Sequence, residues 1–122
     1  MKKLILTVAV LLATTLSAKA EDAESNEINR VNAYDINVNI NSLARYLELS
    51  EDQVESVENV QKIFSEALRC AAVMNTKESR KNMVNNTINF DLKNMKYILT
   101  KDQYRKYVRV LNATINNRGI ER

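Results

Sequence analysis

The sequence predicts an all-α protein whose four helices form two antiparallel helical hairpins, preceded by a cleaved signal peptide. Two observations favour this fold. The 122 residues include no Pro and one Gly, so little in the chain would interrupt a helix. A pentapeptide of the form L-[S/T]-x-D-Q occurs twice, at residues 49–53 and 99–103. Each copy starts a predicted helix, and helices joined by such short connections pack antiparallel to their sequence neighbours.

Residues 1–20 have the organisation of a secretory signal peptide. Two lysines precede an apolar stretch over residues 4–16, and an Ala-Lys-Ala cleavage site ends at Ala20. An uncleaved membrane anchor is the alternative, but about 13 apolar residues are fewer than the roughly 20 that a spanning helix needs. We therefore expect an exported protein, in the bacterial periplasm, with no stable membrane span after processing.

The segment after the cleavage site is acidic and polar. Residues 21–33 read EDAESNEINRVNA and show no apolar period, so we expect a flexible acidic lead-in. Residues 34–122 then form a single helical domain, because a mature chain of about 100 residues provides one core of ordinary size.

The first predicted helix lies within residues 36–47. Ile36, Ile40, Leu43 and Leu47 form a stripe at helical spacing. Apolar residues also alternate with Asn from Ile36 onward, a period of two that suits a strand. A lone strand would have no partner in this chain, and that argument favours a helix.

Three longer helices follow at an even pitch. The first runs from Ser50 to about Met74, the second opens with a weaker capping box of Asn75 and Glu78, and the third stops at Gly119. Helical spacing predicts the apolar face of each. The three faces comprise, in turn, Val54, Val57, Ile63, Phe64, Ala67, Leu68 and Ala71; Val84, Ile88, Leu92, Met95 and Ile98; and Tyr104, Tyr107, Val108, Leu111, Thr114 and Ile115.

The duplicated pentapeptide supplies two of the helix starts. In each copy the hydroxyl residue caps the helix, and the Gln three positions later reaches back to the backbone N–H of the cap residue. The Leu before each cap adds a hydrophobic staple. The residues of this capping motif are Leu49, Ser50, Gln53, Leu99, Thr100 and Gln103. Replacing either Gln by Ala is expected to lower the free energy of unfolding by about 0.5–2 kcal/mol.

Charge is distributed unevenly along the chain. Without residues 1–20 the protein has 15 basic and 15 acidic residues. Residues 21–60 hold ten acids and two bases, a net charge of −8, whereas residues 61–122 hold five acids and thirteen bases, a net charge of +8. The two halves attract each other, or each attracts a partner. Export and overall neutrality argue against nucleic acid as that partner.

The sequence offers no catalytic or metal-binding constellation, so no enzymatic activity, cofactor or metal is expected. The absence of His excludes an imidazole base and His-containing metal sites, and a single Gly excludes glycine-rich phosphate loops. Cys70 is the only cysteine and cannot form an internal disulfide. Its helical spacing with Ile63, Ala67 and Met74 favours a small buried residue, and an intermolecular disulfide is the alternative.

The pentapeptides at 49–53 and 99–103 resemble the LTxxQ signature of the Spy/CpxP family of small exported bacterial envelope proteins. The resemblance also covers the export signal, the helical composition and the approximate length, although the first copy has Ser50 where the family usually has Thr. It implies a cradle-shaped, often dimeric helical protein that acts as an ATP-independent chaperone or in envelope-stress signalling. Metal-responsive members use His or Met ligands, and this chain has no His. The chain is also similar to small exported helical proteins of unassigned function.

A basic and aromatic surface is the candidate polypeptide-binding site. Its residues are Lys93, Lys96, Tyr97, Lys101, Tyr104, Arg105, Tyr107 and Arg109. Three of them, Lys101, Arg105 and Arg109, recur every four residues and form a basic ridge on one helix face. Such a surface would hold unfolded or acidic polypeptide through long-range attraction followed by apolar contact.

Two other interpretations of these residues stay open. In one, the tyrosines belong to the core and the charges form a solvated face. In the other, the basic ridge pairs, within the monomer or across a homodimer, with the acidic residues Glu48, Glu51, Asp52, Glu55 and Glu58. The predicted function is thus an exported helical protein that binds other polypeptides, and the alternative is a structural or assembly module of the envelope with one fixed partner.

Overall fold

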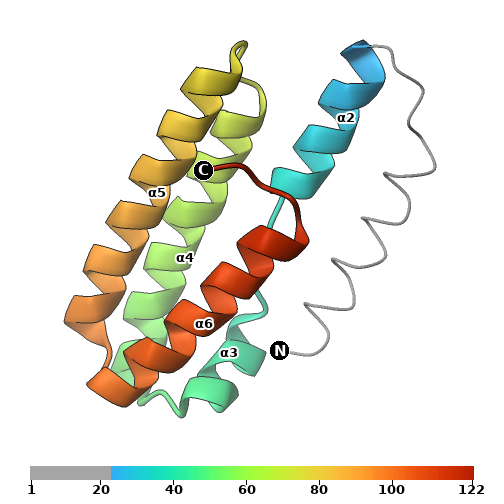
Figure 1. Ribbon diagram of the computed structural model, residues 1–122. Coiled ribbons are helices and arrows are strands. Elements are labelled where there is room, and N and C mark those ends of the chain that lie inside the picture. The colour runs from blue at the N-terminus through green and yellow to red at the C-terminus, as the bar shows by residue number, and fades with distance from the viewer. Residues whose placement is uncertain (1–22) are drawn as a thin grey trace.

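The computed structural model describes residues 23–122 and has five α-helices in that range (Figure 1). They are α2 (Ala23–Tyr34), α3 (Ile40–Leu47), α4 (Glu51–Ala72), α5 (Lys77–Ile98) and α6 (Lys101–Asn117). No residue of the described range lies in a strand, which confirms the all-α class. Residues 23–122 form five helices where four were predicted, and the predicted signal peptide lies outside these residues.

The two longest helices, α4 and α5, run antiparallel and make the most extensive contact between any two helices described (Figure 1). α6 returns beside α5, while the short α3 lies across one end of the molecule against α4 and α6. α2 packs on α4 toward the other end. The main hairpin is therefore α4–α5. The sequence instead predicted two hairpins, each containing one of the motif turns at residues 49–53 and 99–103. One reason is that α3 has only 8 residues and covers little of α4.

One apolar core joins all of these elements. Val57, Phe64 and Leu68 from α4 meet Val84 and Met95 from α5, and each of these side chains is almost fully buried. The helix α6 and the segment before α4 complete the core with Tyr107, Leu111, Ile115, Ile36, Leu43 and Leu47. The predicted apolar faces of α5 and α6 therefore lie in or against the core, apart from the half-buried Val108 of α6.

The helix starts follow the capping chemistry of the sequence, with one exception. Ser50 caps α4 and Thr100 caps α6, and both reciprocal capping boxes are present as predicted. α5 starts later than predicted, because Thr76 is the cap and its hydroxyl accepts the N–H of Ser79 at 3.0 Å. The predicted box of Asn75 and Glu78 is wrong by one residue. Gly119 has a φ of +69° after α6, as its predicted role at a helix end requires.

The predicted helix over residues 36–47 is shorter in the structure. α3 begins at Ile40, where Asn39 caps it by accepting the N–H of Ser42 at 3.1 Å. Residues 35–39 form no helix, yet Ile36 is buried and its carbonyl accepts a hydrogen bond from Ser65 at 2.9 Å. The alternation of Asn and apolar residues therefore belongs to an irregular connection that inserts one side chain into the core.

The prediction of a flexible lead-in over residues 21–33 is wrong for residues 23–33, which belong to α2. Tyr34 is buried at the end of this helix and Val31 packs against the core. Arg30 donates from its Nε to the carbonyl of Ala72 at 2.8 Å. With so few apolar residues in a polar segment, sequence periodicity gave no sign of the helix, and contacts with the rest of the fold hold it.

The outer face of α4 differs from its prediction at two residues. Ile63, predicted in the core, is 49% exposed, and Cys70, predicted as buried, is exposed. At 100° per residue, both lie well away from the line of Val57, Phe64 and Leu68 that faces the core. Across residues 23–122, no helix combines the length and the apolar character needed to cross a membrane.

Candidate functional site

The two motif copies, fifty residues apart in the sequence, meet in the structure. Within each copy the geometry is nearly the same: the Gln side-chain oxygen accepts the cap N–H at 2.9 Å, and the cap hydroxyl accepts the Gln N–H at 3.2 Å. Between the copies, Gln53 Nε2 donates to Gln103 Oε1 at 2.8 Å, and Gln103 Nε2 donates to Gln53 Oε1 at 3.2 Å. The two carboxamides thus form a reciprocal pair.

Each Gln also binds the end of the helix that precedes the other motif copy. Gln53 Nε2 donates to the carbonyl of Ile98 at 3.2 Å, at the end of α5. Gln103 Nε2 donates to the carbonyl of Leu47 at 3.1 Å, at the end of α3. Carbonyl groups in the last turn of a helix have no partner inside it, so these contacts satisfy acceptors that would otherwise need water. The capping motif therefore ties four helix ends into one structural unit.

A second polar cluster lies inside the helix packing, and the sequence analysis did not identify it. Asp91 of α5 is fully buried, and its Oδ2 accepts a hydrogen bond from the hydroxyl of Tyr107 on α6. The same hydroxyl accepts a hydrogen bond from Nε2 of the buried Gln61 on α4, at 2.8 Å. Asp91 is three residues after Ile88 and four before Met95, so its position on the apolar face was the available signal.

The environment of Asp91 favours its neutral form. Burial raises the pKa of Asp91 to about 7, and the hydrogen bond from Tyr107 lowers it only in part. Burial, followed by the nearby Asp91 charge, raises the pKa of the Tyr107 phenol well above its ordinary value. The other carboxyl oxygen, Asp91 Oδ1, is buried with no hydrogen-bond partner in the described chain. The cluster is thus only partly satisfied by hydrogen bonds.

A third polar contact fixes the end of α2. Nη1 of the buried Arg118 donates to the carbonyls of Asn32, Ala33 and Asp35, each at 3.1 Å. Burial lowers the pKa of Arg118 from its ordinary value. The side chain of Arg118, which follows α6, therefore binds the end of a different helix.

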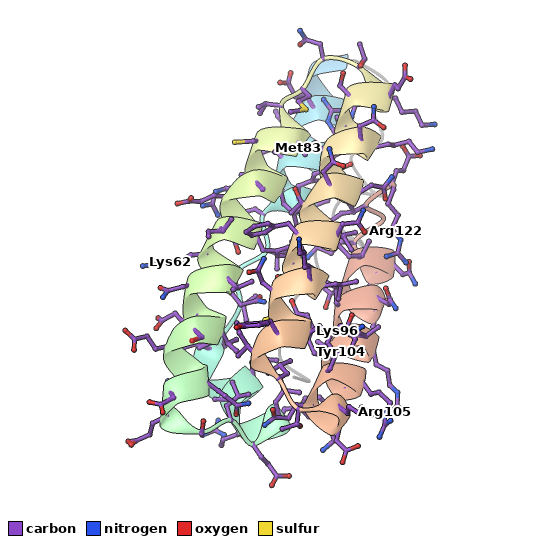
Figure 2. All side chains as sticks on the ribbon, turned by 90° about the vertical axis from the view of Figure 1, so that its left-hand side faces the viewer. Lys62, Met83, Lys96, Tyr104, Arg105 and Arg122 are labelled. Carbon is purple, nitrogen blue, oxygen red and sulfur yellow. The ribbon has the colours of Figure 1, made fainter. Side chains whose placement is uncertain are left out.

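The residues of the predicted polypeptide-binding surface divide between surface and core. Tyr97 is 93% exposed, Tyr104 is half-buried, and Tyr107 is 3% exposed. The five basic residues of the set, namely Lys93, Lys96, Lys101, Arg105 and Arg109, are all exposed. Figure 2 shows Lys96, Tyr104 and Arg105 toward the same end of the molecule, where α5 and α6 are joined. Tyr107 cannot contact a partner at the surface because it is part of the buried cluster.

The outer face of α5 adds an aromatic residue that the sequence analysis left out. Phe90 is 44% exposed and precedes Lys93 and Tyr97 by three and seven residues. At this spacing the three residues share one face of the helix, which points away from the core. Phe90 breaks the apolar period of α5, and that break was the signal for an exposed aromatic side chain. We call Phe90, Lys93, Lys96 and Tyr97 the α5 outer face.

The predicted acidic residues, four on α4 and Glu48 just before it, do not pair with the basic ridge in the monomer. Glu48, Glu51, Asp52, Glu55 and Glu58 are all exposed. The ion pairs of the described chain join Arg69 to Asp35, Lys77 to Glu121 and Arg105 to Asp102. None of them links the acidic residues to the ridge, so both surfaces carry charges available to a partner.

Comparison with known proteins adds no assignment, since no family model, curated protein or solved structure matches the chain. In residues 23–122 there is also no group of three or more His, Cys, Asp or Glu side chains able to hold a metal ion. The candidate site is a surface of exposed aromatic and basic side chains, carried by α5 and α6.

Proposed function

We propose that this chain is an exported helical protein of the bacterial periplasm that binds other polypeptides without ATP or a cofactor, as a Spy-like chaperone or an envelope-stress adaptor. The observation that carries the proposal is the α5 outer face, where Tyr97 is 93% exposed. A large aromatic side chain this exposed adds nothing to the stability of its own fold through burial in the core. It adds to the free energy of binding when a partner covers it.

The charges around the aromatic residues favour unfolded or acidic polypeptide as the partner. Lys93 and Lys96 are exposed beside Tyr97, and Lys101 follows at the start of α6. Positive charge attracts acidic segments over about 8–10 Å at physiological ionic strength, and aromatic rings then hold apolar side chains at short range. Both contributions tolerate many sequences, as a chaperone surface must.

The direct test is suppression of aggregation. The protein is secreted with its own leader and purified from the periplasm, where N-terminal sequencing is expected to start at Glu21. It is then added, reduced and without ATP, to several unrelated proteins as they unfold. Suppression at equimolar or lower amounts, weakened by added salt, is the expected result. Failure with every client would refute the chaperone activity.

Matched variants test whether the α5 outer face is responsible. Tyr97→Ser should reduce suppression several-fold without changing the melting temperature, because the side chain has no role in the core. Ile28→Ser is the control, since Ile28 is 55% exposed but lies on α2. Equal loss in both variants would mean that binding depends on exposed apolar area in general. No loss in Tyr97→Ser would refute the proposed surface.

The alternative function is a structural or assembly module of the envelope with one fixed partner. The exposed apolar residues Ile63 and Val73 on and just after α4 favour it, because they extend the exposed apolar area beyond the α5 outer face. Crosslinking in the native cell distinguishes the two functions. A fixed partner predicts one dominant crosslinked product, whereas a chaperone predicts many.

Self-association belongs to the same proposal. The acidic residues of α4 and the basic ridge of α6 are complementary in charge and unpaired with each other, which favours a homodimer in which they meet across the interface. Sedimentation at low and high salt tests this arrangement. A dimer that dissociates as salt is added is expected, and a monomer at every salt concentration would refute it.

A further inference from the structure

The cluster of Asp91, Tyr107 and Gln61 joins three helices through one buried acidic group. α4 contributes Gln61, α5 contributes Asp91 and α6 contributes Tyr107, and all three side chains are buried. The contact between α5 and α6 is much less extensive than that between α4 and α5. A change in the charge of Asp91 therefore acts on the contact between α5 and α6, which is the less extensive of the two.

We propose that protonation of Asp91 controls the closure of α6 against α4 and α5. In the closed arrangement, which the structure shows, α6 packs on these helices, and in the open arrangement α6 has moved away. The closed arrangement binds one proton more than the open one. The geometry carries this inference. The carboxyl group is fully buried, one of its oxygens has a single donor, and the other has no partner in the described chain. An ionised carboxylate is poorly accommodated in such a site.

Within residues 23–122, no positive charge acts on Asp91 to compensate its ionisation. From α6, Tyr107 and the half-buried Tyr104 lie on this side, and the raised pKa of Tyr107 keeps its phenol neutral at physiological pH. From α4, the neutral Gln61 faces the cluster, and the segment before α4 contributes the apolar Ile36, Val38 and Leu43 beside Tyr107. Gln61 also lines a depression of about 280 Å³, and the charged residues that line it with Gln61 are Glu58, Lys62, Glu66 and Arg69.

The direction of the pH effect follows from these contacts. Burial holds the pKa of Asp91 at about 7 in the closed arrangement, against an ordinary value of 3.8. Below pH 4 the carboxyl group is protonated in both arrangements and has no preference. As the pH rises from 4 toward 7, the open arrangement loses its proton while the closed one retains it, so opening becomes more favourable. Above pH 7 both are ionised and the effect levels off.

Hydrogen exchange measures this opening helix by helix. Exchange is followed by mass spectrometry from pH 5 to pH 8 in the processed protein, and rates are converted to protection factors to remove the intrinsic effect of pH. Uptake of one proton changes the opening equilibrium by up to tenfold per pH unit. Protection in α6 should therefore fall by about 50-fold between pH 5 and pH 7, with a smaller change in α4.

Two variants separate Asp91 from other acidic groups. Asp91→Asn keeps an oxygen for the Tyr107 hydroxyl and cannot ionise, so its α6 protection should not respond to pH in this range. Asp102→Asn changes an exposed acid on α6 and should respond as the unmodified protein does. A response that persists in Asp91→Asn, or an equal loss of protection in α4 and α6, would overturn the proposal.

A direct titration keeps the proposal testable if Asp91→Asn does not fold. The carboxyl carbon of Asp91 in the unmodified protein is followed by NMR as the pH is raised. A midpoint near pH 7 is the expected result. A midpoint near pH 4 would refute the proposal, because an acid that ionises there does so without disturbing the closed arrangement.

Discussion

Replacing Gln53 or Gln103 by Ala tests whether the two motif turns act as one unit. The carboxamide of Gln103 accepts the N–H of Thr100, donates to carbonyls at the end of α3, and pairs with Gln53. Gln53 makes the corresponding three kinds of contact with Ser50, with Ile98 and with Gln103. Each substitution therefore removes a cap contact, a contact to another helix end, and the pair itself.

The magnitude follows from these contacts. An intramolecular hydrogen bond contributes about 1 kcal/mol net, so three kinds of contact suggest about 3 kcal/mol for each Gln. Both side chains are half-buried, and water replaces part of the loss, which lowers the expected cost to about 2–3 kcal/mol. This exceeds the 0.5–2 kcal/mol expected from capping alone. The pair is lost in either single variant, so the double variant should cost about 1–2 kcal/mol less than the sum.

Urea unfolding of the two single variants and the double variant at fixed pH measures this coupling. Ser50→Ala and Thr100→Ala form the matched cycle, because each removes a cap hydroxyl but the two hydroxyls do not bond to each other. Their costs, about 1 kcal/mol each, should add. Additive costs in the glutamine cycle would refute the reciprocal pair.

Three further predictions concern other parts of the fold. Arg118→Met should speed amide exchange in α2 more than in α4, since it removes the contacts to three carbonyls at the end of α2; hydrogen exchange measures it, and unchanged exchange in α2 would contradict it. Gly119→Ala should lower the free energy of unfolding by about 1–2 kcal/mol through its positive φ alone, because no atom lies within 4 Å of an added Cβ. Asp91→Asn should raise the free energy of unfolding by about 2–4 kcal/mol at pH 8 and by much less at pH 4. The raised pKa of Asp91 destabilises the folded protein only at pH values where Asp91 of the unfolded chain is ionised. Urea unfolding at both pH values checks the difference.

The parts of the fold that sequence predicts well are those with strong local signals. The α4 and α6 starts were predictable because each capping box involves residues only three positions apart. The long apolar stripes of α5 and α6 and the left-handed Gly119 were predictable for the same reason. By contrast, Asn75 and Thr76 are both good cap residues, and sequence alone placed the start of α5 one residue early.

The parts that sequence missed depend on contacts between distant segments. α2 carries only a few apolar residues, and Tyr34 and Arg30 hold it through contacts with other parts of the chain. The Gln53–Gln103 pair joins residues fifty positions apart, so the duplication was visible but the contact was not. Tyr107 belonged both to the predicted apolar face of its helix and to the predicted surface, and its burial in the core beside Asp91 decides between the two.

The contacts of the capping motif separate its role in folding from any role in binding. The carboxamide groups of Gln53 and Gln103 are engaged with backbone atoms and with each other. The resemblance to the Spy/CpxP signature therefore rests on residues that organise helix ends, whereas the proposed binding surface rests on Tyr97 and its neighbours. At a temperature well below its melting temperature, Gln103→Ala should suppress aggregation as well as the unmodified protein does, when both are compared at equal concentrations of folded protein. Loss of suppression at an unchanged melting temperature would show that the motif itself contacts the client.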